Sequence, residues 1–197
     1  MAVVDLLGLL ARFADVDDLE VQRAYYRTKV PSVGPQAYLN IVFRPTDVAV
    51  RKEVEHEVGL QPDLVEFYSR CNGARLFFDR VSIYGCLPRP HPPLDRDDPF
   101  GFLPFDLRRV NAELGEDLAE RNLLCVGAYG YDRSYVSVRR DTCEVVCATG
   151  DDFDRLRARW RSLSDWLSSE IPRVGGCFDE RGKLLVTPEA TLPGLTH

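Results

Sequence analysis

The segment Leu64–Gly73 constrains the fold most, because it has the marks of a short amphipathic helix with a defined start and end. Its apolar and semi-polar residues recur at helical spacing and place one stripe against a core: Leu64, Phe67, Tyr68 and Cys71. Pro62 and Asp63 suit a first helical turn, and Asn72-Gly73 is predicted to supply the left-handed residue that closes the helix. The following segment Ala74–Gly85 is rich in strand-forming residues, so we predict one strand there.

Composition describes one ordinary domain that can bury a core, with 197 residues, 45% hydrophobic and 28% charged. The net charge of −6 argues against binding to nucleic-acid phosphates. The apolar run Met1–Phe13 is interrupted by Asp5 and lacks a basic start, so we expect neither a signal peptide nor a membrane span. A cytoplasmic protein without nucleic-acid or membrane partners is the expectation.

The six cysteines include no C-x-x-C pair, and without a secretion signal their even number does not indicate a disulfide framework. We expect buried, reduced thiols. The three histidines lie far apart in the sequence, at positions 56, 91 and 197, and do not match the spacing of zinc ligands. The sequence therefore predicts no metal site and no cofactor.

The remaining elements follow from hydrophobic period and from turn residues. We predict helices at Val3–Phe13, from a cap at Thr46 to Gly59, at Asp106–Glu120 and at Asp151–Ile171, where Pro172 ends the helix and Ser162 with Asp165 resembles a capping box. We predict strands at Tyr38–Phe43, Leu123–Ala128, Ser134–Arg139 and Cys143–Ala148. Leu19–Val30 fits either a helix or a strand, Leu87–Pro99 is a proline-rich exposed loop, and the residues after Val186 are expected to be loose.

This order of elements predicts an α+β domain with helices packed on one side of an antiparallel sheet. The helix from Thr46, the Gly-Leu-Gln-Pro-Asp-Leu entry, the Asn72-Gly73 exit, Tyr84-Gly85, the Tyr131–Val146 hairpin and Trp160–Ile171 resemble the SUKH superfamily. That family includes fungal cell-wall-assembly regulators and bacterial immunity proteins that neutralise toxins. The resemblance covers roughly residues 45–175 and implies a core domain at 45–187, an added N-terminal segment at 1–44 and a tail at 188–197. Residues 14–45 and the proline-rich loop depart from the family pattern.

Recognised catalytic motifs are absent from the sequence: it has no G-x-S-x-G, H-E-x-x-H, Walker or dinucleotide-binding pattern. Asp151-Asp152 fits an acid–base pair, but adjacent acids at a predicted helix start more often complement the helix dipole. Arginines 155, 157, 159 and 161 fit an anion site or, with more weight, a solvated helix face. Of the two tryptophans, we favour Trp160 as the core residue.

The segment Tyr129–Tyr135 is the sharpest local feature, since three tyrosines, an Asp and an Arg occupy one predicted hairpin turn. Tyr and Arg are enriched at binding hot spots, although the same tyrosines would also suit a sheet edge that covers a helix. The candidate partner-binding residues are Tyr129, Tyr131, Asp132, Arg133, Tyr135, Asp151 and Asp152. With the resemblance, they favour an immunity protein that occludes a basic toxin domain, such as a nuclease. The alternatives are an intracellular scaffold or regulator and a small enzyme with an unrecognised site.

Overall fold

The computed structural model describes residues 5–13, 24–29, 38–90, 103–150 and 152–194. Within these ranges eight strands form one antiparallel sheet whose order follows the chain. The strands are β1 (Ala24–Lys29), β2 (Tyr38–Phe43), β3 (Ala74–Leu76), β4 (Val81–Ile83), β5 (Leu123–Tyr129), β6 (Ser134–Arg139), β7 (Val145–Thr149) and β8 (Asp152–Trp160). The helices are α1 (Leu6–Leu10), α2 (Val48–Val58), α3 (Pro62–Arg70), α4 (Leu107–Glu120) and α5 (Leu163–Gly175), with 3₁₀ turns η1 (Ala11–Phe13) and η2 (Pro188–Thr191).

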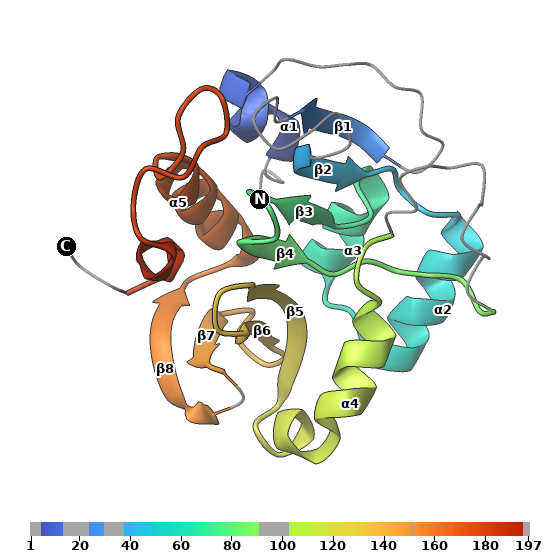
Figure 1. The fold of residues 1–197 in the computed structure, drawn as a ribbon. Helices are drawn as coiled ribbons and strands as arrows, with labels where there is room; N and C mark the ends of the chain where they lie inside the picture. Colours follow the sequence, from blue (N-terminus) through green and yellow to red (C-terminus); the bar gives the residue numbers. More distant parts are fainter. Residues whose placement is uncertain (1–4, 14–23, 30–37, 91–102, 151, 195–197) are drawn as a thin grey trace.

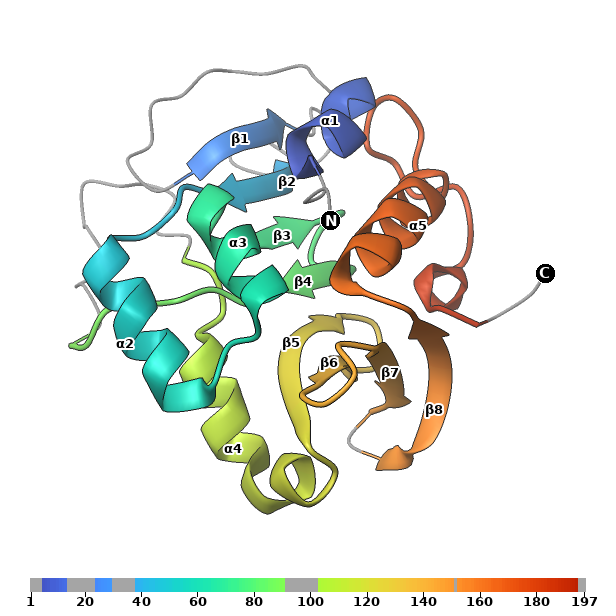
Figure 2. The ribbon, with the colours of Figure 1, turned by 180° about the vertical axis from the view of Figure 1, so that it is seen from behind.

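The sheet is strongly curved, so that β5 to β8 wrap around the lower part of the molecule in Figure 1. Seen from behind, α3 and α5 lie in front of the sheet, with α1 beside α5 (Figure 2). The predicted α+β fold is confirmed. No helix in the described part of the chain is long and apolar enough to cross a membrane.

The core lies between the sheet and these helices. Leu64, Phe67 and Tyr68 of α3 are buried as predicted, and the Tyr68 hydroxyl donates to the Tyr84 carbonyl at 2.9 Å. Leu6 and other residues of α1 and η1 join the same core, and β1 and β2 belong to the same sheet. The described residues of the N-terminal segment therefore share the core and the sheet of the main domain.

Gly73 does not close α3, which corrects the sequence prediction. The helix ends at Arg70 and is followed by Cys71 in an extended conformation. Gly73 has a φ of +84°, and an added Cβ would lie 2.5 Å from the Ile83 carbonyl oxygen and 2.7 Å from that of Tyr84. The glycine is thus required because β4 approaches the backbone closely.

Asn72 acts through its side chain rather than as a helix cap. Its amide oxygen accepts from the Cys86 N–H at 2.6 Å, and its amide nitrogen donates to the Cys86 carbonyl at 3.0 Å. Because both groups are buried, this pair replaces two backbone hydrogen bonds that the chain would otherwise lack. Asn72 therefore fixes the segment after β4 against the segment after α3.

Residues 74–85 form a hairpin, not the single strand predicted. The turn between β3 and β4 contains three consecutive residues with left-handed backbone conformation, Phe77, Phe78 and Asp79, with φ of +54°, +56° and +62°. Buried Asn40 of β2 accepts from the Phe77 N–H at 3.0 Å. None of the three is Gly or Asn, so the turn was not recognisable from its composition.

The predicted helix at 151–171 is wrong in its first half. Asp152–Trp160 is strand β8, paired with β7, and only Leu163–Gly175 is helical. The capping prediction is confirmed, since the Ser162 hydroxyl accepts from the Asp165 N–H at 3.1 Å. Pro172 does not end the helix, which continues to Gly175. Of the tryptophans, Trp166 is fully buried and Trp160 only partly, the reverse of the preference stated above.

The ends of the other elements show smaller differences. Ala24–Lys29 is a strand, Gly59 closes α2 with a φ of +67°, and Asp47 rather than Thr46 precedes α2. Most of the proline-rich loop lies outside the described residues. Residues 188–194, expected to be loose, pack against α5 instead: Arg173 donates to the Ala190 and Thr191 carbonyls at 3.1 and 2.8 Å.

Candidate functional site

The turn between β5 and β6 is held by one carboxylate. Asp132 accepts hydrogen bonds from the Ser134 N–H at 3.0 Å and from the Ser134 hydroxyl at 2.7 Å. Its second oxygen pairs with Arg157 of β8 at 2.5 Å, and Arg157 also donates to the Ser134 hydroxyl at 3.0 Å. Arg157 was expected on a solvated helix face. Because Asp152–Trp160 is a strand, Arg157 instead fixes the conformation of the Asp132–Ser134 turn.

Tyr129 is fully buried, so it is not a surface contact as the sequence predicted. Its hydroxyl donates to the Glu170 carboxylate at 2.6 Å and accepts from the Trp166 indole at 3.2 Å. Burial and the nearby Glu170 carboxylate raise the pKa of Tyr129 well above its usual value. Glu170 also binds Arg173, at 2.6 Å. Tyr129 therefore anchors the start of the turn to α5.

Tyr131 belongs to the same turn and is 41% exposed. Its hydroxyl donates to the Glu189 carboxylate of η2. This hydrogen bond raises the pKa of Tyr131 and lowers that of Glu189. The turn is therefore connected to α5, to β8 and to the C-terminal segment, and it presents Tyr131 on a rigid support.

A hollow of about 300 Å³ lies beside this turn. Three residues that are neighbours across adjacent strands line the hollow. Ser82 of β4 is paired with Ala128 of β5, and Ala128 is paired with Tyr135 of β6. Directly opposed residues project to the same face of a sheet. The small side chains of Ser82 and Ala128 leave space that larger neighbours enclose: Tyr84, Phe105, Val110, Arg133 and Tyr135.

The left-handed turn of the β3–β4 hairpin borders the hollow through Asp79. Gly130 packs directly on it, since an added Cβ would lie 2.1 Å from the Asp79 carbonyl oxygen, and the Gly130 N–H donates to the Arg80 carbonyl at 3.2 Å. Sparsely populated backbone conformations persist only where the surroundings enforce them, and they gather at functional sites. The two turns thus hold each other at the edge of the hollow.

The charge at the hollow is uneven. Asp79 is neutralised by Arg75, whose Nε lies 2.7 Å from the carboxylate and whose guanidinium lies 5.1 Å from the centre of the Phe105 ring. Arg133 is exposed, has a φ of +58° and makes no ion pair with any residue that the structure describes. No described residue therefore compensates the positive charge of Arg133 at this mostly apolar surface.

The structure brings five of the predicted residues together, and Asp152 is not among them. Tyr129, Arg133 and Tyr135 line the hollow, while Tyr131 and Asp132 lie on the adjoining turn. Asp152 is exposed on β8, where it accepts from the Asp154 N–H at 3.2 Å, so its predicted position at a helix start is wrong. Asp151 lies outside the described residues.

Residues from other elements complete the surface and were missed by sequence analysis. They include Ser82 of β4, Tyr84 immediately after β4, Phe105 before α4, Val110 of α4 and Ala128 of β5. Their proximity depends on the pairing of β4 with β5, which the prediction of a single strand at 74–85 did not contain. The one available signal was Phe105, an aromatic residue immediately before a predicted helix.

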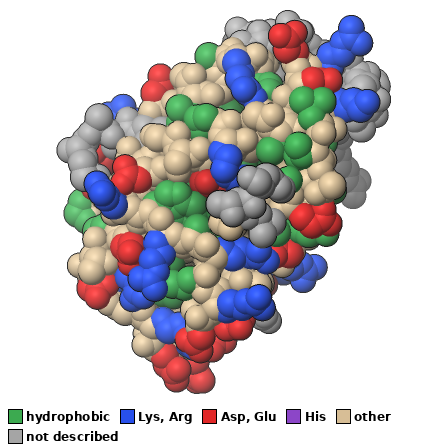
Figure 3. Space-filling view, turned by 90° about the vertical axis from the view of Figure 1, so that its left-hand side faces the viewer, with side chains coloured by type: hydrophobic (Ala, Val, Ile, Leu, Met, Phe, Trp, Pro, Cys, Tyr) green, Lys and Arg blue, Asp and Glu red, His purple; other side chains and the backbone are tan. Residues whose placement is uncertain are grey.

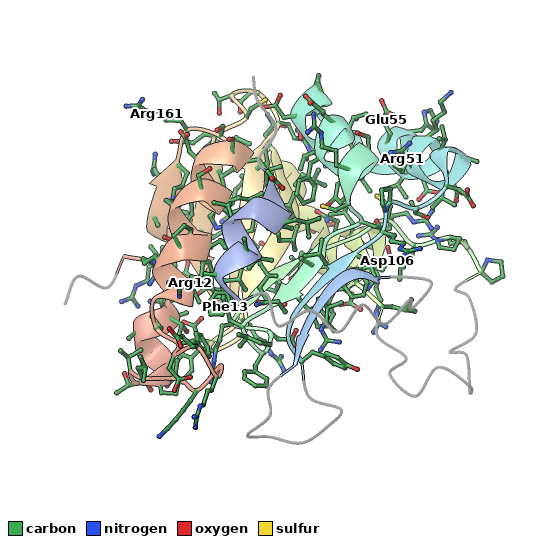
Figure 4. All side chains as sticks on the ribbon, turned by 90° about the horizontal axis from the view of Figure 1, so that it is seen from above. Arg12, Phe13, Arg51, Glu55, Asp106 and Arg161 are labelled. Carbon is green, nitrogen blue, oxygen red and sulfur yellow. The ribbon has the colours of Figure 1, made fainter. Side chains whose placement is uncertain are left out.

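The charged cluster around α2 and α4 has a structural role. The buried Arg108 guanidinium binds Glu53 at 2.7 Å and Glu57 at 3.2 Å, and it also donates to the Leu87 carbonyl. Burial opposes the charge of Arg108, but the two carboxylates outweigh it and raise its pKa. In Figure 4, Arg51 and Glu55 of α2 lie on the same side of the molecule as Asp106, away from Arg12 and Phe13. The cluster joins α2, α4 and the segment after β4.

The remaining surfaces offer less specific chemistry. On the side of α5 and β8, acidic and basic side chains are interspersed and the visible hydrophobic areas are small and separate (Figure 3). All six cysteines are free, and burial raises the pKa of Cys71, Cys86 and Cys125 to about 12. No group of three potential metal ligands occurs among the described side chains.

Comparisons with known proteins identified no relative of this chain. No protein-family model, no curated protein and no solved structure matches the chain. The turn, the adjoining hollow and the sequence resemblance are therefore the features that bear on function.

Proposed function

We propose that this chain is a non-catalytic binding protein, an immunity protein that neutralises a cognate toxin by binding and occluding it. The observation that carries the proposal is the turn at residues 131–133. It presents exposed Tyr131 and Arg133, which has no ion-pair partner in the described part of the chain, on a support tied to α5, β8 and η2. A contact surface that is already ordered loses little entropy on binding, and Tyr and Arg are the residue types that dominate binding energies.

The resemblance to the SUKH superfamily supports the toxin as partner, since many bacterial members neutralise toxins. The net charge of −6 supports a basic toxin domain. Opposite net charges accelerate encounter, and salt weakens this effect. Local contacts at the turn would then determine how long the complex persists, while the overall charge would determine how fast it forms.

The decisive experiment is co-expression with the toxin encoded beside this protein's gene, followed by purification of the complex and measurement of its dissociation constant. Tyr131→Ala and Arg133→Ala should each weaken binding by ~2 kcal/mol or more, about 30-fold, as expected for central aromatic and Arg contacts. Arg70→Ala is the matched control. Arg70 is an exposed arginine at the end of α3, on the helix-covered face of the sheet, and its ion pair with Glu66 is solvent-exposed.

Two outcomes would contradict the proposal. If cells expressing the toxin die despite this protein and no complex is recovered, the immunity function is wrong, and a regulatory or scaffold role replaces it. If a complex forms but the Tyr131 and Arg133 variants bind as tightly as the Arg70 control variant, the toxin contacts another surface. In a successful experiment the association rate should also fall as salt concentration rises.

A further inference from the structure

The hollow beside the turn has features of a site for one side chain of a partner. Its volume of about 300 Å³ lies at the lower end of the range for ligand sites, which run from ~300 to ~1,000 Å³. We propose that it receives a single aromatic or large aliphatic side chain of the toxin, and that a carboxylate next to that side chain in sequence pairs with Arg133. This inference rests on the proposed function, because it specifies which part of the partner makes the central contact.

The apolar part of the hollow is formed by small residues of the sheet and by two aromatic rings beside them. Ser82 and Ala128 are small, while Tyr84 and Phe105 meet edge-to-face with ring centroids 6.1 Å apart. An inserted ring would therefore meet aromatic surface at the sides and small side chains below. Aromatic rings favour edge-to-face and offset contacts of this kind, and burial of a large apolar side chain is the main source of affinity in such pockets.

The two charged residues that line the hollow, Asp79 and Arg133, differ in their ion pairs. Asp79 is already paired with Arg75. Arg133 lines the hollow without an ion-pair partner among the described residues, so an incoming carboxylate would meet an uncompensated cation. A cationic group in the same position would meet no free carboxylate of the lining residues. Charge complementarity therefore selects an acidic group beside the apolar one, even on a toxin whose overall charge is basic.

The geometry is fixed before binding. Gly130 packs on the Asp79 carbonyl, which belongs to the left-handed turn Phe77 to Asp79, so the two turns fix each other at this edge. Arg157 and Asp132 hold the backbone that carries Arg133. A site whose walls are fixed in this way discriminates between side chains by fit and charge rather than adapting to each of them. Binding should therefore depend on both the ring and the carboxylate.

Short peptides test this inference without the toxin. Acetyl-Phe-Glu-amide and acetyl-Phe-Gln-amide differ only in charge, and acetyl-Ala-Glu-amide lacks the ring. Binding is measured by titrating each peptide into the isotope-labelled protein and following the backbone amide signals of Ala128, Arg133 and Tyr135. We expect acetyl-Phe-Glu-amide to bind about fivefold more tightly than acetyl-Phe-Gln-amide, as for a partly exposed ion pair. Acetyl-Ala-Glu-amide should bind about tenfold or more weakly than acetyl-Phe-Glu-amide.

Variants assign the charge effect to one residue. Arg133→Gln should abolish the difference between the Glu and Gln peptides, Arg133→Lys should restore part of it, and Arg70→Gln should leave it unchanged. Unshifted signals outside the hollow show that each variant is folded. The inference is overturned if the Glu and Gln peptides bind equally, if the shifts lie elsewhere, or if no peptide gives saturable binding. A toxin complex that forms despite such a result would preserve the immunity function and reject only this contact.

Discussion

Gly73→Ala is the substitution whose effect the structure determines most directly. Gly73 has a φ of +84°, and its Cβ position is 2.5 and 2.7 Å from two carbonyl oxygens of β4 and the residue after it. An L-residue in the left-handed region costs ~1–2 kcal/mol. Forcing a methyl group into a packed site typically costs a further ~1–3 kcal/mol. We therefore expect a loss of ~2–5 kcal/mol in the free energy of unfolding.

The two oxygens cannot move freely. The Ile83 residue pairs with Ala74 across the hairpin, and the Tyr84 carbonyl accepts the buried Tyr68 hydroxyl at 2.9 Å. Gly150→Ala is the matched control, because Gly150 also has a left-handed φ, +56°, but the nearest atom to its Cβ position, the Asp132 carbonyl oxygen, lies at an ordinary contact distance of 3.9 Å. It should lose only the backbone cost of ~1–2 kcal/mol.

The measurement is urea unfolding of both variants and the parent protein, followed by far-ultraviolet circular dichroism and tryptophan fluorescence. The difference between the two glycine variants isolates the steric contribution, which should be ~1–3 kcal/mol. If Gly73→Ala loses no more stability than Gly150→Ala, then the close approach of β4 is not what requires this glycine. In that case the left-handed backbone conformation of Gly73 alone would account for it.

Three further predictions concern buried or partly buried polar groups. The contribution of the buried thiols to the free energy of unfolding should be constant below about pH 9 and fall as pH rises toward 12. Burial raises the thiol pKa values from 9.0 to about 12, so only the unfolded chain ionises in that interval. Urea unfolding at pH 8 and pH 11 checks this, and equal stabilities would contradict it. The thiols concerned are Cys71, Cys86 and Cys125. Arg140→Ala should lower the free energy of unfolding by ~1–3 kcal/mol, because Arg140 donates to the Val58 carbonyl at the end of α2 at 2.5 Å. Arg139→Ala is the control: it removes a partly exposed ion pair and should lower the free energy of unfolding by less than ~1 kcal/mol. Glu170→Gln should lower the free energy of unfolding by ~2 kcal/mol or more, because it removes the carboxylate that pairs with Arg173. Since Arg173 also donates to the Thr191 carbonyl, proteolysis of the C-terminal segment should increase. Unchanged stability and cleavage would show that the Glu170–Arg173 pair is dispensable.

Helix α3 was predictable because its signals are local. Pro62 stands at the first helical turn, and the apolar stripe lies within nine residues, so no distant contact is needed to identify it. The strands β5 and β6 were equally accessible, since turn residues separate two short apolar runs. The Ser162 cap of α5 belongs to the same group of local signals.

Strand β8 was mispredicted because its sequence fits two periods. Phe153, Leu156 and Trp160 match helical spacing, yet the backbone of this segment pairs with β7. Pairing with β7 therefore determines that this segment is a strand, since strand propensity reflects packing against neighbouring strands more than the segment's own sequence. Because this segment is a strand and not a helix, Asp152 is not at a helix start and Arg157 lies beside Asp132.

The sequence by itself determined the α+β composition, the α3 unit and the identity of the Tyr- and Arg-rich turn. Each of these depends on residues within a few positions of one another, where hydrogen bonding, proline and side-chain period act directly. Only the tertiary structure decided that Tyr129 is buried and that Ser82, Ala128 and Tyr135 align across three strands. Register between strands depends on the whole sheet, so the hollow beside Arg133 exists only once β4, β5 and β6 have paired.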